Sequence, residues 1–565
     1  MACLALACAA RPAKRPAAGD TQPRSAPTAR PGSDTRSSAE GAGTAGVAEL
    51  LRDAVLAARR EGGGAPEAGD LGGALHSVYE RTGWGALWLG DGRATPQASA
   101  VLAHLARAGE SGLRPGDYDA TGLTSRVAAM SPRAAPADLA RLDVALSLAL
   151  LRNLSDLRVG RANPERARFS IGAGQDALVG LVGEIASARD AASLLANAGP
   201  RWDGYTRLRR ALVRYRTLAS DPSFQPPGDL TGLRPGGRSP QVPALRRWLE
   251  ALGDAPVAGP ATARSDVYDR ELVLAMKHFQ ERHGLAPDGT IGKGTAQALR
   301  VPLSERVRQI ERTLERWRWL PEPGPQPPIV VNIPEFRLFV PQGASGTNGE
   351  TPDMKVIVGE AGKTETPELS GEMEYLVFRP AWGVPHSIVV NEMLAKIRKN
   401  PAYLAGERLE IVGGGAPTQA VSKATLAGLA SGALGLRQRP GPENSLGLVK
   451  FVFPNDDDIY LHATPAKSLF SRARRDFSHG CIRVEEPVEL AQYVLRSDPA
   501  WTRERVRTAM DGGGTRQVDL ASPIPVHVVY FTAAAGPGGE VRFFDDLYRR
   551  DEALQSLLSG GTPQP

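Results

Sequence analysis

The sequence predicts a multidomain α+β protein in which helical domains come first and a β-rich domain follows. The chain has 565 residues, which at roughly 150 residues per domain corresponds to about three or four domains. Apolar residues recur at the three-and-four spacing of buried helices over much of the first half of the chain. Beyond a proline-rich break at 321–328, β-branched and alternating runs replace that pattern. We therefore expect an α-helical scaffold domain, a small three-helix domain, and a β-rich domain that carries an inserted helical subdomain.

The composition argues against nucleic acid as a partner. Lys and Arg number 68 against 62 Asp and Glu, and the net charge of +6 is spread thinly along the chain. A nucleic-acid-binding protein would be expected to gather its basic residues on one face. The mild excess of positive charge remains compatible with an anionic polymer such as a cell wall. In the folded part of the chain, no apolar run approaches the roughly 18 residues of a membrane-spanning helix.

The N-terminus combines a short apolar start with a low-complexity stretch. Residues 1–45 begin "MACLALACAARPAKRP" and continue with Pro, Ala, Ser, Gly and Arg, with few large apolar side chains to offset the entropy of ordering. We interpret them as a signal remnant and a disordered tether. Cys8 weakly resembles the cleavage position of a lipoprotein signal, and a misplaced start codon explains the same residues equally well. Both alternatives indicate an exported protein of the periplasm or cell envelope, and a membrane anchor at the N-terminus stays open.

Residues 46–225 are expected to form the helical scaffold domain. One helix there carries a stripe of apolar residues on a single face: Leu142, Ala145, Leu146, Ala149 and Leu150. The large aromatic residues of this region are interpreted as core anchors rather than as ligand contacts: Trp84, Trp88 and Tyr118. The pattern indicates a fold type and leaves the role of this domain open.

The next segment, 233–302, has clearer helix boundaries. Asp269 is expected to cap the start of a helix, and Gly284 to end it. Together with the apolar spacing this predicts a small three-helix domain. A linking helix is expected within 303–324, with one buried stripe: Val307, Ile310, Leu314 and Trp317.

The β-rich domain is expected over 325–535. Five runs are β-branched or alternating, and Gly or Pro bounds them: "PIVVNIPEFRLFV" (328–340), "MKVIVGE" (354–360), "MEYLVFRPAW" (373–382), "KFVFPNDDDIYLHATP" (450–465) and "IPVHVVYFTA" (524–533). Residues 388–442 read as helical and Gly-rich, which predicts an insertion that caps the sheet. Residues 536–565 are expected to be a C-terminal tail.

The candidate chemistry centres on "SHGCIRV" (478–484), which holds Cys481, the one cysteine beyond position 8. A thiol attacks as thiolate and usually needs a histidine as base. His479 lies two residues away along an extended strand, about 6.6 Å, which is too far unless a turn at Gly480 draws it in. His462 ends another strand, from which its Cβ would lie roughly 4.5–5.5 Å from that of Cys481 if the strands are neighbours. We therefore prefer His462 as the base.

The residues around Cys481 suggest how a reacting carbonyl would be held. Gly480 lets the backbone turn so that the amides of residues 480–481 face a developing oxyanion. Arg483 shares the face of Cys481 and suits a substrate carboxylate, whereas Ser478 fits a backbone cap. Two alternatives stay open: a metal site built from the two histidines and the cysteine, and an inert buried cysteine.

Longer stretches resemble a known family. "YLHATPAKSLFSRARRDFSHGCIRVEEP" (460–487) resembles the signature of the L,D-transpeptidase (YkuD-type) catalytic domain. "VNIPEFRLFV" (331–340), "RQRPGPENSLGLVKFVFPN" (437–455) and the domain order resemble the large multidomain branch of that family. "GLAPDGTIGKGTAQAL" (284–299) resembles the type 1 peptidoglycan-binding domain. Three positions depart from the branch pattern, Arg379, Ala381 and Ala395, and none of them belongs to the cysteine motif.

The resemblance implies an acyl transfer on peptidoglycan stem peptides. It makes Cys481 the nucleophile and His462 the base, with His479, Gly480 and Ser478 supporting the oxyanion site. It also implies a substrate groove, and the residues expected to line it are Arg483, Trp382, Tyr460 and Asn444. The thioester that forms would release the terminal D-Ala of a tetrapeptide and pass to the amine of a second stem, joining third residues. No metal or cofactor is expected, and carbapenem β-lactams are expected to acylate Cys481.

Three other functions remain to be separated from this one. Transfer of the acyl group to water would make the protein an L,D-carboxypeptidase with the same site residues, although a capping insertion that excludes water favours transfer. A catalytically idle peptidoglycan-binding scaffold is supported by the binding module and opposed by the complete Cys, His and Arg set. Sortase chemistry uses the same residue types but does not place them within Ser-His-Gly-Cys-x-Arg.

Overall fold

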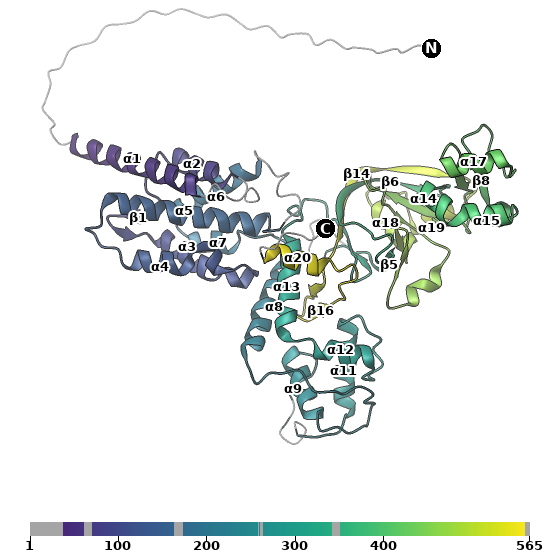
Figure 1. Ribbon diagram of the computed structural model, residues 1–565, viewed down its shortest axis with the longest axis horizontal. Helices are drawn as coiled ribbons and strands as arrows, with labels where there is room; N and C mark the ends of the chain where they lie inside the picture. The colour runs from purple at the N-terminus through teal and green to yellow at the C-terminus, as the bar shows by residue number, and fades with distance from the viewer. Residues whose placement is uncertain are drawn as a thin grey trace, which may run out of the picture.

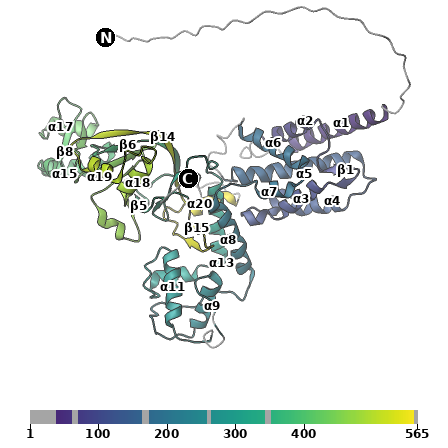
Figure 2. The same ribbon diagram turned by 180° about the vertical axis from the view of Figure 1, so that it is seen from behind.

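The computed structural model describes residues 38–61, 70–162, 173–257, 259, 264–341 and 351–559. Three lobes meet around two neighbouring helices, α8 (Asp203–Ser220) and α13 (Leu303–Trp317) (Figure 1). The view from behind shows the first helical lobe and the catalytic sheet on opposite sides of this junction (Figure 2). The predicted order of helical regions followed by a β-rich region is confirmed. Of the predicted tether, residues 1–37 lie outside the described residues, and α1 begins at Ser38.

The first lobe is helical, with one pair of very short strands. Its elements are α1 (Ser38–Glu61), α2 (Leu71–Arg81), β1 (Leu89–Gly90), β2 (Arg93–Ala94), α3 (Pro96–Ala106), η2 (Ala108–Ser111), η3 (Pro115–Tyr118), α4 (Ala120–Ala128), α5 (Pro136–Arg158), α6 (Ala173–Ser187) and α7 (Ala191–Ala196). Helix α5 carries the predicted stripe, and Leu146 and Leu150 on it are fully buried. Trp88 and Tyr118 join the same core, as predicted, while Trp84 packs against it half-buried.

The second lobe contains three helices in its described residues: α9 (Val242–Leu252), α11 (Arg270–Arg282) and α12 (Lys293–Arg300). The side chain of Asp269 accepts a hydrogen bond of 2.9 Å from the amide of Leu272, so the predicted N-cap is confirmed. Gly284 has φ +67° and follows the end of α11, as a helix-stop glycine does. These helices share a core with α8 and α13, which places the linking helix at the centre of the molecule.

The third lobe is built on a nine-stranded sheet. Its strands are β3 (Ile329–Asn332), β4 (Arg337–Phe339), β5 (Asp353–Gly359), β6 (Leu369–Phe378), β10 (Val449–Val452), β11 (Leu461–His462), β12 (Asp476–Ser478), β13 (Ile482–Val484) and β14 (Arg516–Val529). The order is β12-β5-β13-β11-β10-β6-β14-β3-β4, and β5 also pairs with β4, so the sheet closes into a barrel. All five predicted strand runs contribute to it. Three short helices accompany the sheet: η5 (Lys467–Ser471), α18 (Pro487–Val494) and α19 (Arg503–Asp511).

The predicted insertion is a small folded unit at the outer end of this lobe (Figure 1). It contains β7 (Trp382–Val384), α14 (His386–Ile388), η4 (Val389–Met393), α15 (Leu394–Lys399), α16 (Tyr403–Gly406), β8 (Leu409–Val412), α17 (Lys423–Ser431) and β9 (Gly435–Gln438). Besides the expected helices it has a three-stranded sheet in the order β7-β9-β8. Its strands β8 and β9 lie outside the five runs that the sequence predicted as strands.

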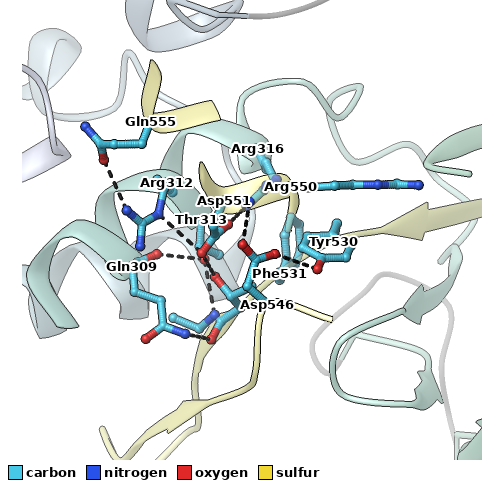
Figure 3. Close-up of polar contacts among 12 residues, drawn as sticks. Gln309, Arg312, Thr313, Arg316, Tyr530, Phe531, Asp546, Arg550, Asp551 and Gln555 are labelled. Carbon is cyan, nitrogen blue, oxygen red and sulfur yellow. Dashed lines mark hydrogen bonds and ion pairs between the residues drawn. The ribbon is translucent and has the colours of Figure 1, made fainter. Parts of the chain in front are cut away.

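The segment expected to be a C-terminal tail is folded as far as residue 559. Its strand β16 (Val541–Phe543) forms a hairpin with β15 (Ala533–Ala535), at the end of the expected β-rich domain, and α20 (Arg550–Leu558) follows. Arg316 of α13 forms a buried ion pair with Asp551, and Arg312 also contacts that carboxylate (Figure 3). Its apolar residues are few, which is why their pattern did not reveal it. Among the described helices, none has both the length and the apolar character to span a membrane.

Candidate active site

Cys481 lies at the turn between two strands of the barrel. Strand β12 ends at Ser478 and β13 begins at Ile482. Strand β13 runs between β5 and β11, so the cysteine enters the middle of the sheet rather than an edge. The thiol is free and partly buried. The sheet therefore fixes the backbone on both sides of Cys481.

His462 and Arg483 are paired residues on neighbouring strands. Strands β11 and β13 are parallel and match His462 with Arg483, and the antiparallel pairing of β10 matches Lys450 with His462. One face of the sheet thus presents a row of Lys450, His462 and Arg483. Cys481, two residues before Arg483, lies on the same face beside Tyr460. The expected direct pairing of His462 with Cys481 is therefore displaced by two residues along the strands.

His462 is almost completely buried and neutral. Its Nδ1 lies 2.6 Å from the carbonyl oxygen of Ala463, and because a carbonyl can only accept, this contact favours a proton on Nδ1. The backbone of Leu446 also hydrogen-bonds the ring. Burial and the positive charges of Arg483 and Lys450 lower the pKa of His462 to about 3. The imidazole is therefore in its proton-accepting form at any pH near neutrality.

Cys481 rests as a thiol. Burial raises its pKa, although the amide and hydroxyl of Tyr460 and the charges of Lys450 and Arg483 oppose that shift. The thiol also lies 3.8 Å from the carbonyl oxygen of Asp458. The described hydrogen bonds include none between Cys481 and His462, so the site does not hold a preformed thiolate–imidazolium pair.

The turn before Cys481 leaves one amide for an oxyanion. Gly480 has φ +112°, a conformation that L-residues with a side chain rarely adopt. Its own N–H points to the hydroxyl oxygen of Ser478 at 3.2 Å, which corrects the expectation that both amides face the substrate. No acceptor for the N–H of Cys481 occurs among the described residues. Ser478 is buried and acts here as the predicted backbone cap.

His479 points to the insertion rather than to the thiol. Its Nε2 lies 2.6 Å from a carboxylate oxygen of Glu392 on η4, and both side chains are about 45% exposed. A ring held in this way is poorly placed to take a proton from Cys481. The contact instead joins the cysteine motif to the capping insertion.

The four residues expected to line the groove differ in their surroundings. Tyr460 contacts both Cys481 and the half-buried Trp382, and its ring carries the ammonium of Lys450 at 3.6 Å from the centroid. Arg483 has a buried Nε without a hydrogen-bond partner.

The expectation that Asn444 contacts the substrate is not met. It is 1% exposed, and its amide is engaged by the backbone of Gln438, Arg439 and Leu446. It holds the turn after β9 and has no free group to offer a substrate.

Sequence reasoning missed three residues near the cysteine. Lys450 left a visible signal, because it is a charged residue in an otherwise apolar strand. Glu392 and Thr366 left none: the first reaches His479 from the insertion, and the second reaches the carbonyl of Gly480 from a loop more than a hundred positions away. Within the described residues, no group of three or more His, Cys, Asp or Glu side chains is arranged to hold a metal ion.

Comparison with known families gives three matches along the chain. Residues 73–212 match a "Scaffold domain", residues 238–299 a "Putative peptidoglycan binding domain", and residues 327–507 an "L,D-transpeptidase catalytic domain". A Haemophilus influenzae protein described as "Putative L,D-transpeptidase" is 29% identical over 229 residues. That similarity covers 40% of this chain and 45% of the Haemophilus protein, so the two correspond over less than half of their lengths.

The third match contains the whole row of Lys450, His462 and Arg483, together with Cys481 and its glycine turn. The predicted order of scaffold, peptidoglycan-binding and catalytic regions agrees with the order of the three matches. The chain therefore carries an L,D-transpeptidase catalytic domain of the YkuD family, preceded by a scaffold domain and a peptidoglycan-binding domain.

Proposed function

We propose that the protein crosslinks peptidoglycan stem peptides by L,D-transpeptidation through a thioester on Cys481. The observation that carries the proposal is the arrangement on one sheet face: a thiol with an unbound amide, beside a neutral histidine between two cations. A nucleophile, a proton acceptor, an oxyanion donor and charge for an anionic substrate are the parts that acyl transfer needs. Because peptidoglycan is the substrate, the protein would work in the cell envelope.

In the first half-reaction the sulfur of Cys481 bonds to the carbonyl carbon of the third stem residue. His462 accepts the thiol proton at its unprotonated ring nitrogen, and the N–H of Cys481 donates to the oxyanion. When the tetrahedral intermediate collapses, the bond to the terminal D-Ala breaks and its amine takes the proton from His462. In the second half-reaction an amine of another stem attacks the thioester, the carbon–sulfur bond breaks, and the amine's proton returns to the sulfur.

Substrate charge helps to activate His462 in this scheme. In the free protein Arg483 is one of the causes of the low pKa of His462. A substrate carboxylate paired with Arg483 cancels that charge and so raises the pKa of the imidazole toward its usual value. The base then becomes stronger when a donor stem is bound, and the idle enzyme keeps its cysteine mainly in the less nucleophilic thiol form.

The test is incubation of the purified protein with a disaccharide-tetrapeptide, followed by mass spectrometry of the products. Dimers joined through their third residues support the proposal, whereas tripeptide monomers alone would identify an L,D-carboxypeptidase. Cys481→Ala should abolish both products, and His462→Ala should slow their formation strongly. If His479→Ala abolishes acylation while His462→Ala does not, the assignment of the base is wrong. If the protein forms no product but still binds sacculi, only the function as a peptidoglycan-binding scaffold remains.

A carbapenem gives a second test of the same nucleophile. Attack of the thiolate on the strained lactam opens the ring and leaves the whole drug bound to Cys481. The intact mass of the wild-type protein should rise by the mass of one carbapenem, and that of Cys481→Ala should not change. An unmodified wild-type protein would count against the nucleophile.

A further inference from the structure

A loop whose two ends, Gly359 and Thr366, are buried supports the cysteine turn. Residues 359–366 follow β5 and fold back tightly: a Cβ added to Gly359 would lie 1.9 Å from the carbonyl oxygen of Thr364. The amide of Glu360 and the hydroxyl of Thr364 both donate to the carbonyl of Ser478, at 3.1 and 2.8 Å. The loop thus holds the turn at the residue where β12 ends.

Thr366 makes the contact closest to the reacting centre. It is completely buried, and its hydroxyl donates to the carbonyl oxygen of Gly480 at 2.7 Å while accepting from the amide of Gly359 at 2.9 Å. The two contacts use the hydroxyl once as donor and once as acceptor, so its hydrogen is fixed. The carbonyl of Gly480 is therefore held in one direction.

We propose that Thr366 is a positioning residue that aims the N–H of Cys481 at the oxyanion. The carbonyl of Gly480 and the N–H of Cys481 belong to the same planar peptide group, and in a trans peptide they point in opposite directions. Holding the carbonyl inward against Thr366 therefore directs the amide outward. The inference rests on the proposed function, because an oxyanion forms only if Cys481 attacks a carbonyl.

The support extends to the C-terminal segment, beyond the matched catalytic domain. The hydroxyl of Tyr548 donates to the carbonyl of Gly359 at 2.7 Å and accepts from the amide of Thr366 at 3.3 Å. The amide of Tyr548 donates to the hydroxyl of Tyr530, which in turn donates to Asp546. Figure 3 shows Tyr530 and Asp546 beside the ion pairs of α13. Residues 530–558 therefore brace the loop that carries Thr366.

The experiment compares two reactions of the same thiol. Acylation by a carbapenem passes through an oxyanion, whereas alkylation by iodoacetamide displaces iodide and forms none. Thr366→Val removes the hydroxyl and keeps the shape, and Thr366→Ser restores the hydroxyl. Thr364→Val is the matched comparison, because it removes a hydroxyl from the same loop that reaches Ser478 instead of Gly480. Rates are measured on the full chain, by intact mass for acylation and by the mass of the peptide that contains Cys481 for alkylation, because iodoacetamide also reacts with Cys3 and Cys8.

We expect Thr366→Val to slow acylation by about tenfold or more, less than the roughly 100- to 1,000-fold that follows complete loss of an oxyanion donor. Alkylation should stay within about twofold of the wild type, Thr366→Ser should recover most of the acylation rate, and Tyr548→Phe should lower acylation more mildly. A merely structural role would slow both reactions together, which would overturn the inference, as would wild-type acylation by Thr366→Val. If the wild type itself is alkylated but not acylated by either carbapenem or tetrapeptide, the proposed function fails and the inference fails with it.

Discussion

Replacing Gly480 by alanine tests whether the cysteine turn is held in a conformation that only glycine accepts easily. At φ +112° a side chain strains the backbone by about 1–3 kcal/mol. The added methyl would meet Cδ1 of Ile459 at 3.4 Å, which is ordinary contact, so the cost comes from the backbone and not from a clash. Relief of this strain requires a change in the backbone torsions of residue 480, which reorients the peptide groups on either side of it, and one of these carries the N–H of Cys481. We therefore expect a loss of about 1–3 kcal/mol in the free energy of unfolding and a loss of acylation of about 100-fold, as for a removed oxyanion donor.

Gly415 provides the matched control for this substitution. It has φ +118°, and a Cβ added there would meet nothing within 4 Å. Gly415→Ala should therefore carry a similar backbone strain, and it lies in the insertion away from the cysteine turn. Urea unfolding measures the stability of both variants, and intact mass after addition of a carbapenem measures acylation. Wild-type acylation by Gly480→Ala, or an equal loss in both variants, would refute the reasoning.

Three further outcomes follow from the charges and burial at the site. Glu392→Gln should change the acylation rate by less than about fivefold, because a half-exposed ion pair is worth about 0.2–1 kcal/mol; a tenfold loss would contradict this. Alkylation of Cys481 by iodoacetamide should keep accelerating at alkaline pH, because burial raises the pKa of the thiol, and a plateau below pH 8 would show the opposite. Burial lowers the pKa of His527 to about 4 and that of His462 to about 3, so below about pH 6.5 the unfolded chain takes up protons that the folded chain does not. Between pH 6.5 and 4, each of the two histidines should therefore lower the free energy of unfolding by up to about 1.4 kcal/mol for each pH unit that the pH falls. In urea titrations, His527→Gln should remove the contribution of one histidine, about one proton, from this pH dependence.

The fold could be predicted where a long segment buries one regular face. The stripe on α5 and the capped helix α11 have this property, since each buried face repeats over several turns. The strands of the barrel were visible as apolar runs because both of their ends are marked by Gly or Pro. The sheet of the insertion and the C-terminal hairpin were not predicted, although barrel strands of the same length, such as β3 and β10, were found within longer apolar runs. Their pairing depends on contacts between distant segments, which local patterns do not record.

Part of the candidate site could likewise be predicted from the sequence, and part could not. The sequence identified Cys481 and the turn at Gly480 because the whole turn lies within a few residues. It also led to the neighbouring strand of His462, but the register that sets Arg483 opposite that histidine needs the structure. Asn444 was expected to line the groove, but its side-chain amide is hydrogen-bonded to the backbone of its own turn. Sequence reasoning recognises a residue type suited to the chemistry, whereas burial decides whether its polar atoms are free.

The contacts that hold the turn at Cys481 differ between its inner side and its outer side. On the inner side Thr366 is fully buried and hydrogen-bonded twice, so the oxyanion turn has no second arrangement of similar energy. On the outer side the contact between His479 and Glu392 is half exposed, and water can replace it at little cost. The insertion has its own core, separate from that of the barrel. Under the proposed function, a substrate that breaks the contact between His479 and Glu392 would therefore leave the direction of the Cys481 amide unchanged.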